Sequence, residues 1–326
     1  MGKSYLITGG TGFIGTNLVR QLAVTGAKIR VLDNLSTSTV DDLRGWPVEL
    51  ILGDIRDEGL VTRAMAGVSM VVHLAAHTDV VQSLADPKLS LEVNVAGLFN
   101  LLQASLSHGV ERFIFASTGG AILADKDPPV HEEMAPFPIS PYGASKLAGE
   151  GYCSAFWGSY GLKTISLRFA NIYGPFSYHK GSVIAHFFKR IKQDQELTIF
   201  GDGNQTRDFL YAGDLCEAII RAFQADLPFG KTIHLGSGKE VTVNELVSLM
   251  RLVVGEKDFP PVIHAPDRAG EVRRNSVAID RAQEYLDFVP KTDLLTGLRL
   301  TWNWFNQKDV SLGLKKAEED LAAGGC

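Results

Sequence analysis

Tyr142 and Lys146 are the residues whose types and spacing most directly suggest proton transfer. They lie four residues apart in a segment that reads Ser-Pro-Tyr-Gly-Ala-Ser-Lys from residue 140, so a helix that begins at Pro141 puts both side chains on one face. A free tyrosine has a pKa of about 10 and is neutral at pH 7, but a cation at about 4–5 Å can lower that pKa to about 7. The pair is therefore suited to take a proton from an alcohol, with Tyr142 as the base and Lys146 as the activating cation.

Two hydroxyl groups are expected beside this pair. Residues 113–117 have the composition of a buried strand, which ends in Ser117 and is followed by Thr118. Strands of a parallel sheet deliver the residues at their carboxyl ends to the crevice where ligands bind. We therefore expect both hydroxyls to reach the crevice that holds Tyr142.

A glycine-rich turn near the start of the chain predicts a pyrophosphate site. Gly9, Gly12 and Gly15 follow the apolar run 5–8 and open a segment with helical spacing of apolar residues, which begins with Phe13 and Ile14. Glycines there permit a tight turn, close approach of the backbone to a pyrophosphate and tight packing of the helix, whose N-terminal amides meet the negative charge. A second strand-like run ends in Asp33, 18 residues after Gly15. A carboxylate at that place binds a ribose 2′-hydroxyl and repels a 2′-phosphate, so the pattern favours NAD over NADP.

Strand-like runs alternate with helical segments along the first two thirds of the chain. The runs are residues 5–8, 29–33, 49–53, 70–74, 113–117, 164–169 and 232–235. Such alternation predicts an α/β protein with a Rossmann-like, doubly wound parallel sheet. From about residue 171 the sequence is irregular and rich in Gly, Pro and aromatic residues, which predicts a smaller C-terminal substrate-binding lobe. We expect an NAD-binding domain over residues 1–170, to which parts of 205–240 return, a discontinuous lobe over most of 171–326, and a terminal helix from Lys315 that ends in a mobile tail.

Composition excludes several other classes of protein. The chain has 326 residues, of which 45% are apolar, and a net charge of −5, which offers no basic surface for nucleic acid. No run of about 18 apolar residues predicts a membrane span, and no room for a signal peptide precedes the first strand, so a cytoplasmic protein is expected. Cys153, Cys216 and Cys326 lack the spacing of a metal or redox site, and no metal is expected. His73 is expected to be a packed, hydrogen-bonded histidine rather than a catalytic one.

Together these motifs resemble the extended short-chain dehydrogenase/reductase family. Within it the chain is similar to the NAD-dependent nucleotide-sugar epimerases and dehydratases, and most similar to proteins of the UDP-glucose 4-epimerase type. The resemblance implies that Thr118 binds the reacting oxygen and passes its proton to Tyr142, although a shift of one residue would give this role to Ser117. It also implies cofactor contacts beyond the glycine turn, from Phe13, Ile14, Asp33, Asn34, Ser36, Asp54, Ile55, Leu74, Ala75, Ala76, Asn94, Tyr142 and Lys146.

The resemblance further implies a site for a nucleoside diphosphate sugar, most simply a UDP-sugar. Arg207 and Arg268 would clamp its two phosphates, since a guanidinium fork suits paired phosphate oxygens. Asn171 would bind the sugar or a phosphate, and Glu271 the ribose of the nucleotide. Asn275 would line the hexose pocket, where its modest size leaves room for an N-acetyl group.

The residues that follow Thr118 narrow the expected reaction. Family members begin by removing hydride from C4 of the sugar, which gives a 4-keto intermediate. Relatives that eliminate water carry Asp-Glu directly after the hydroxyl residue, whereas this chain has Gly119 and Gly120. The resemblance therefore favours 4-epimerisation of a UDP-hexose, UDP-N-acetylhexosamine or UDP-uronic acid. The alternatives are a decarboxylase or dehydratase of the same family and a non-catalytic NAD-binding sensor protein. Helices near residues 86–109 and 142–160 suggest a homodimer.

Overall fold

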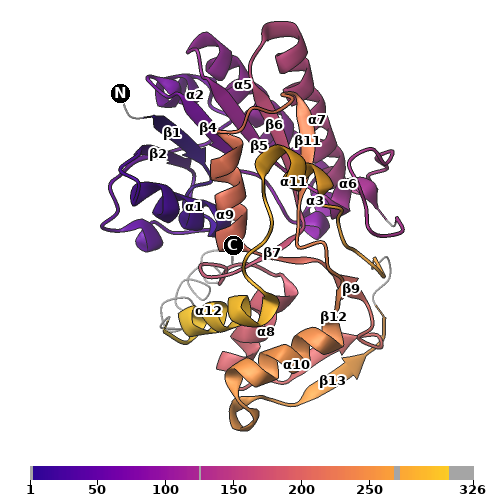
Figure 1. Ribbon diagram of the computed structural model, residues 1–326. Helices are drawn as coiled ribbons and strands as arrows, with labels where there is room; N and C mark the ends of the chain where they lie inside the picture. Colours follow the sequence, from indigo (N-terminus) through magenta and orange to yellow (C-terminus); the bar gives the residue numbers. More distant parts are fainter. Residues whose placement is uncertain (1–2, 125, 268–271, 308–326) are drawn as a thin grey trace, which may run out of the picture.

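A seven-stranded parallel sheet forms the centre of the larger domain (Figure 1). The computed structural model describes residues 3–124, 126–267 and 272–307, so the helix expected from Lys315 lies outside the described residues. The strand order is β3-β2-β1-β4-β5-β6-β11, and every neighbouring pair is parallel. The Rossmann-like prediction is confirmed, and all seven expected strands lie in this sheet: β1 (Ser4–Thr8), β2 (Lys28–Asp33), β3 (Val48–Leu52), β4 (Met70–His73), β5 (Arg112–Thr118), β6 (Thr164–Phe169) and β11 (Lys231–Leu235).

Helices cover both faces of the sheet because successive strand residues point to opposite sides. On one face Ile7, Val31 and Ile114 pack with the apolar sides of α1 (Phe13–Ala23) and α9 (Ala212–Ala222). On the other face Leu6 and Phe115 belong to a second core with α2 (Glu58–Met65), α5 (Gly97–Ser107) and α7 (Pro141–Tyr160). Shorter elements lie around this domain: η1 (Asp41–Leu43), α3 (Val80–Ala85), α4 (Pro87–Leu91), the π-helical η2 (Glu92–Ala96), α6 (Gly120–Leu123) and α11 (Asp280–Leu286).

The stretch Pro87–Ser107 is the one described segment long and apolar enough to span a membrane, although the sequence suggested no such run. In the structure it forms α4, the π-helical turn and α5, which pack against α2 and α7 at one face of the sheet. Leu98, Leu101 and Leu102 are fully buried there. Packing in the protein core accounts for the apolar composition of this stretch.

The smaller lobe has a core of its own below the sheet (Figure 1). Three short strand pairs form its framework, β7 (Asn171–Tyr173) with β10 (Phe209–Tyr211), β8 (Leu197–Phe200) with β13 (Val262–Ala265), and β9 (Thr206–Arg207) with β12 (Val241–Thr242). The accompanying helices are α8 (Val183–Lys192), α10 (Val243–Val254), η3 (Glu256–Asp258) and α12 (Leu294–Gln307). The lobe is discontinuous in sequence, since α9 and β11 pack with the larger domain; the boundary at residue 170 stays a prediction.

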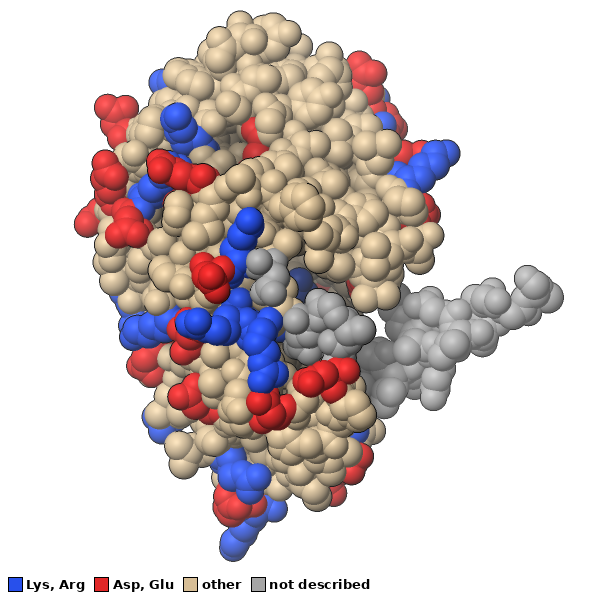
Figure 2. Space-filling view, turned by 90° about the vertical axis from the view of Figure 1, so that its right-hand side faces the viewer, with Lys and Arg blue, Asp and Glu red and all other residues tan. Residues whose placement is uncertain are grey.

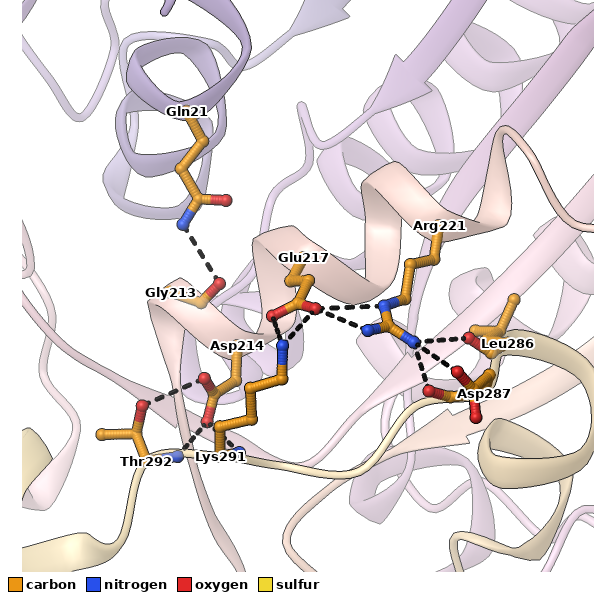
Figure 3. Close-up of polar contacts among 9 residues, drawn as sticks. All are labelled: Gln21, Gly213, Asp214, Glu217, Arg221, Leu286, Asp287, Lys291 and Thr292. Carbon is orange, nitrogen blue, oxygen red and sulfur yellow. Dashed lines mark hydrogen bonds and ion pairs between the residues drawn. The ribbon is translucent and has the colours of Figure 1, made fainter. Parts of the chain in front are cut away.

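Helix α9 fastens the two parts together (Figure 3). The Asp214 carboxylate accepts hydrogen bonds from the backbone amides and the hydroxyl at Lys291 and Thr292, in the segment that leads into α12. Gln21 of α1 donates to the carbonyl of Gly213 at the start of α9. The smaller lobe is thereby held beneath the carboxyl edge of the sheet, the edge where parallel α/β sheets bind ligands.

Candidate active site

Tyr142 and Thr118 meet where β5 ends and α7 begins. The Ser140 side chain caps α7 by accepting from the Gly143 amide at 3.1 Å, and Pro141 occupies the first turn, so Tyr142 leaves the helix at its very start. A hydrogen bond joins the side chains of Tyr142 and Thr118. Burial raises the pKa of the Tyr142 phenol to about 12, and this hydrogen bond opposes the rise. The protein's own groups therefore keep Tyr142 protonated at neutral pH.

Lys146 is buried one helical turn further on. Its ammonium donates to the carbonyl of Ala116 at 2.8 Å and stands 4.9 Å from the centre of the Phe115 ring. Burial lowers the pKa of Lys146 to about 8, while Cys153 and Glu150 act to raise it. The expectation that the Lys146 charge would bring the pKa of Tyr142 to about 7 is not met by the protein groups alone, because desolvation of the phenol outweighs the other effects.

Ser117 points away from Tyr142. Its hydroxyl donates to Oε1 of Glu150 at 2.6 Å, and the residue is buried. Of the two candidate hydroxyls, the structure thus brings Thr118 and not Ser117 to Tyr142, as the preferred sequence interpretation expected.

The glycine turn has the geometry that a pyrophosphate requires. Gly9 has φ +69°, and a Cβ atom there would lie 2.7 Å from the Ala75 amide nitrogen. A Cβ atom at Gly15 would collide with the backbone of Gly9 and Gly10. Gly12 caps α1 without a side chain, and a Cβ atom there would meet only the Gly9 carbonyl oxygen, at 3.2 Å. The amides of Phe13, Ile14 and Gly15 in the first turn of α1 therefore have no side-chain cap, and these residues fit NAD.

Asp33 connects the end of β2 to the same turn. Its two carboxylate oxygens accept from the Thr11 amide at 3.1 Å and the Leu35 amide at 2.9 Å. Each carboxylate oxygen can accept a further hydrogen bond, so the side chain can still bind ribose hydroxyls. Asp33 is thus both an anchor of the turn and the expected ribose ligand.

The residues expected around adenosine form a polar chain at the ends of β2 and β3. Asn34 accepts from the Ser36 amide and donates to Asp54 at 3.0 Å. Arg56 binds both oxygens of Asp54 and lowers the pKa of that carboxyl to about 2. Ile55 packs on Gly97 of α5, where a Cβ atom would stand 2.6 Å from the Ile55 side chain. The pairing of Arg56 with Asp54 was not anticipated from the sequence.

Asn94 secures the turn after β4, which contains Leu74, Ala75 and Ala76. Its amide group exchanges two hydrogen bonds with the backbone of His77, at 2.8 and 3.0 Å, and donates to Ser145 of α7 at 2.9 Å. The residue lies in the π-helical turn η2, a feature often found at functional sites. Both hydrogen-bonded groups of the Asn94 side chain therefore bind the protein itself, and they hold the turn after β4 in place.

His73 is packed below this turn, as expected. Its Nδ1 lies 2.7 Å from the Thr8 hydroxyl, and burial lowers its pKa to about 3. The imidazole is therefore neutral across the physiological range and contributes packing and a hydrogen bond.

The smaller lobe supplies the remaining candidates. Arg207 donates to the carbonyls of Thr206 and Val272, each at 2.8 Å, and half-buried Asn171 begins β7. The side chain of Asn275 reaches the larger domain, where a Cβ atom at Gly120 would stand 3.1 Å from its Nδ2. Arg268 and Glu271 lie outside the described residues.

Asp208 was missed by sequence reasoning. It is fully buried, and its oxygens accept from the Ser237 amide and hydroxyl and from the amides of Gly238 and Val277. These bonds fix the segment that carries Asn275 to the end of β11. A charged residue between Arg207 and an apolar strand was the available signal.

A phosphate-binding turn, a ribose carboxylate and a Thr–Tyr–Lys arrangement on a doubly wound sheet together define an NAD-dependent enzyme of the short-chain dehydrogenase/reductase class. More specifically, the chain belongs to the NAD dependent epimerase/dehydratase family, whose model matches residues 5–236.

The chain is similar along nearly its whole length to named relatives. It is 33% identical to the UDP-glucose 4-epimerase of Mycolicibacterium smegmatis, over 93% of this chain and 98% of the relative. Among solved structures it resembles the UDP-glucose 4-epimerase of Thermotoga maritima with UDP-glucose, at 36% identity and a TM-score of 0.88 over 93% of this chain and 99% of that one. It also resembles the Thermus thermophilus UDP-glucose 4-epimerase in complex with NAD, at 35% identity and a TM-score of 0.85, over 94% and 100% of the two chains.

Proposed function

We propose that this protein is an NAD-dependent 4-epimerase of a UDP-linked hexose. The observation that carries the proposal is the hydrogen bond between Thr118 and Tyr142 at the carboxyl edge of the sheet, one helical turn before Lys146. The three relatives described above are named UDP-glucose 4-epimerases, and the glycine turn and Asp33 fit NAD. Figure 2 shows Lys and Arg side chains gathered across the middle of one face, where the two lobes meet, which suits an anionic substrate.

The chain's own residues account for the handling of the proton. Thr118 holds the C4 oxygen of the sugar next to Tyr142, and the Tyr142 oxygen receives its proton through the hydrogen bond with Thr118. NAD, when bound, supplies the acceptor and donor of hydride and, in its oxidised form, a positive charge. Lys146, one helical turn after Tyr142 on α7, contributes a second positive charge, which favours the phenolate. Once C4 is a ketone, the sugar must turn over in the site so that the opposite face of C4 would meet the hydride donor, while Tyr142 gives its proton back to the C4 oxygen.

The residues after Thr118 favour epimerisation over elimination of water. Elimination requires an acid and a base close to C5 and C6, and Gly119 and Gly120 carry no side chains for this. A Cβ atom at Gly119 would make only ordinary contacts, 3.5 Å from Val277 and 3.7 Å from the Phe169 carbonyl oxygen. Close packing therefore does not require glycine at this place, and the absence of an acid and a base after Thr118 is what favours epimerisation.

The smaller lobe favours a neutral sugar over a uronic acid. Arg273 and Arg274 directly precede Asn275 in the sequence, and free guanidinium groups there would attract a sugar carboxylate. In the structure Arg273 forms an ion pair with Asp202, and Arg274 forms one with Glu240, each at 2.6 Å. A sugar carboxylate would have to compete with these pairs, so we propose UDP-hexose and UDP-N-acetylhexosamine as the substrates.

The test is incubation of the purified protein with UDP-hexoses, UDP-N-acetylhexosamines and UDP-uronic acids, without added NAD, followed by NMR of the products. Interconversion of C4 epimers without net NADH supports the proposal. Release of carbon dioxide would identify a decarboxylase, and a stable keto sugar a dehydratase. Binding of NAD without turnover of any sugar would indicate the non-catalytic sensor.

We further propose that two copies of the chain associate through α3, α4 and α7. Apolar side chains are exposed on these neighbouring helices, notably Val81 at 74%, Leu84 at 61% and Leu91 at 59%. Tyr152 of α7 is also exposed and contacts Phe99 of α5 edge to face. A second copy would cover this surface. Light scattering of the wild type should give twice the mass of the chain, and Leu84→Glu should give the mass of a single chain. A variant that keeps the doubled mass would exclude this face as the dimer interface.

Cys153 and Cys216 are buried free thiols, which agrees with a proposed cytoplasmic location.

A further inference from the structure

Three successive residues at the end of β5 are each bound to a different residue of α7. The Ala116 carbonyl accepts from Lys146, the Ser117 hydroxyl donates to Glu150, and Thr118 is hydrogen-bonded to Tyr142. The three helix residues are spaced four apart, so they form one line along α7. The catalytic groups are therefore the first two members of a row whose third member is Glu150.

Glu150 is in turn fixed by Arg168 of β6. Arg168 Nε donates to Oε1 at 2.8 Å and Nη2 donates to Oε2 at 2.7 Å, and the side chains of Arg168 and Glu150 are 4% and 7% exposed. Ser117 and Arg168 are register partners in adjacent strands, so both donors to Oε1 come from the sheet itself. A two-pronged ion pair away from water has a narrow choice of geometry. It fixes the rotation and the height of α7 relative to β5 and β6.

The pair lies behind the catalytic groups. Glu150 lies two turns from Tyr142, and Arg168 lies in the fully buried strand β6. A charged pair buried behind a catalytic row is costly to keep, since apolar residues of similar volume would serve the packing at least as well. The contacts of the Glu150–Arg168 pair indicate that it fixes the position of Tyr142 and Lys146 on α7.

We propose that Glu150 and Arg168 are positioning residues: through Ser117 and α7 they hold Tyr142, Lys146 and Thr118 in line, and they reserve Thr118 as the hydroxyl that faces the substrate. The proposal rests on the proposed epimerase function. Ser117 cannot turn towards Tyr142 while it donates to Glu150. The Glu150 carboxylate also favours the charged form of Lys146, which burial opposes.

The first experiment compares Glu150→Gln with wild type, using full-length protein saturated with NAD. We expect kcat to fall at least tenfold, KM for the UDP-sugar to stay within about threefold, and NAD affinity to be unchanged. The matched control is Glu217→Gln, which removes a carboxylate paired with Arg221 and Lys291 on α9 and should leave kcat unchanged (Figure 3). A higher KM or a weaker affinity for NAD, with kcat at the wild-type value, would overturn the proposal.

The second experiment follows the ionisation of Lys146 directly, by NMR of protein labelled at lysine Cε with ¹³C. The titratable groups around Lys146 are Tyr142, Glu150 and Cys153 on its own helix and His73 on β4, and Arg168 on β6 is paired with Glu150. Without the Glu150 charge the pKa of Lys146 should fall, and the alkaline limb of the kcat profile should move to lower pH. This readout requires no turnover, so it remains valid if the wild-type protein epimerises none of the sugars tested. An unchanged Lys146 pKa would overturn the proposal.

The third experiment separates positioning from folding. Glu150→Gln leaves Arg168 as an unpaired buried charge and should lower the melting temperature. The double variant Glu150→Gln/Arg168→Met removes that charge, so the melting temperature should recover while kcat stays low. Recovery of both the melting temperature and kcat in the double variant would show that the pair serves stability alone.

If Glu150→Gln does not fold, Ser117→Ala is the alternative variant, because it breaks only the contact between β5 and Glu150. It should lower kcat about threefold with unchanged KM, and a wild-type kcat in that variant would overturn the proposal.

Discussion

The side-chain amide of Asn275 lies against the backbone of Gly120, two residues after Thr118, whose hydroxyl we propose to be catalytic. A Cβ atom at Gly120 would stand 3.1 Å from Asn275 Nδ2. Asn275 belongs to the segment that Asp208 fixes to the end of β11, and its own amide donates to the Thr206 hydroxyl at 3.3 Å. A side chain from the smaller lobe is therefore held beside the end of β5, where we propose that the sugar turns.

Asn275→Tyr tests this contact as a gate for the sugar. The larger ring would fill the space next to Gly120, so we expect the kcat/KM ratio of UDP-N-acetylglucosamine to UDP-glucose to fall about tenfold or more for steric reasons. Asn275→Ala is the control, since it removes bulk and should preserve both substrates. Equal loss of both substrates in the tyrosine variant, or a wild type that never accepts the acetylated sugar, would show that Asn275 is not the gate.

Tyr142→Phe tests the assignment of the base. The ring remains and the ionisable oxygen is lost, so turnover should fall by about 100-fold or more while the melting temperature and NAD affinity are retained. Stopped-assay NMR of the epimer ratio measures the rate. Near-normal turnover would exclude Tyr142 as the base.

The sheet could be predicted from the sequence because its strands are continuous apolar runs separated by helical segments. Each of the seven runs became a strand of one sheet. The choice between Ser117 and Thr118 could not be made in the same way, since it depends on a partner distant in sequence. Glu150, 33 residues after Ser117, occupies the serine hydroxyl and leaves Thr118 for Tyr142.

Two buried ionic groups went unpredicted for a similar reason. Arg168 interrupts an apolar strand and Glu150 follows Lys146 by one helical turn, but nothing local indicates that they pair. A charge within a buried strand does require a partner, so Arg168 was a signal that could have been used. The direction of the pKa change at Tyr142 was also wrong for the protein alone, because the cost of burying the phenol cannot be judged from residue spacing.

Lys146→Met tests the activating charge. Its loss removes the group that favours the Tyr142 phenolate, so the pKa of Tyr142 rises, and activity that requires the phenolate should appear only at higher pH. We expect the acid limb of the kcat profile to move to higher pH and kcat at pH 7 to fall about tenfold or more. Lys163→Met, at an exposed lysine just before β6, is the control. A profile that keeps both its height and its position would exclude this role for Lys146.

The buried histidines predict sensitivity of the fold to acid. Burial lowers the pKa values of His73 and His234 to about 3, from 6.5 for an exposed histidine. At pH values between about 3 and 6.5 the unfolded chain binds protons that the folded chain does not. The free energy of unfolding therefore decreases as the pH falls from about 6.5 towards 3. Each histidine adds up to about 1.4 kcal/mol per pH unit to this slope. Urea titrations from pH 7 to 4 should show a shallower slope for His73→Gln, and a wild-type slope for exposed His108→Gln; equal slopes in all three would exclude the effect.

Asp33→Ala tests the cofactor site, and the structure separates two effects of this change. The carboxylate anchors the Thr11 and Leu35 amides, so its loss should lower the free energy of unfolding by about 1–3 kcal/mol. It is also the expected ribose ligand and the source of repulsion for a 2′-phosphate, so NAD affinity should fall and the preference for NAD over NADP should narrow.

Asp33→Asn is the matched variant, because it keeps a side-chain acceptor but lacks the charge. It should lose less stability than Asp33→Ala and should narrow the preference for NAD over NADP as much. Calorimetric titration with both dinucleotides and a melting curve for each variant measure the two effects. Unchanged affinity for NAD and NADP in both variants would show that Asp33 only anchors the glycine turn.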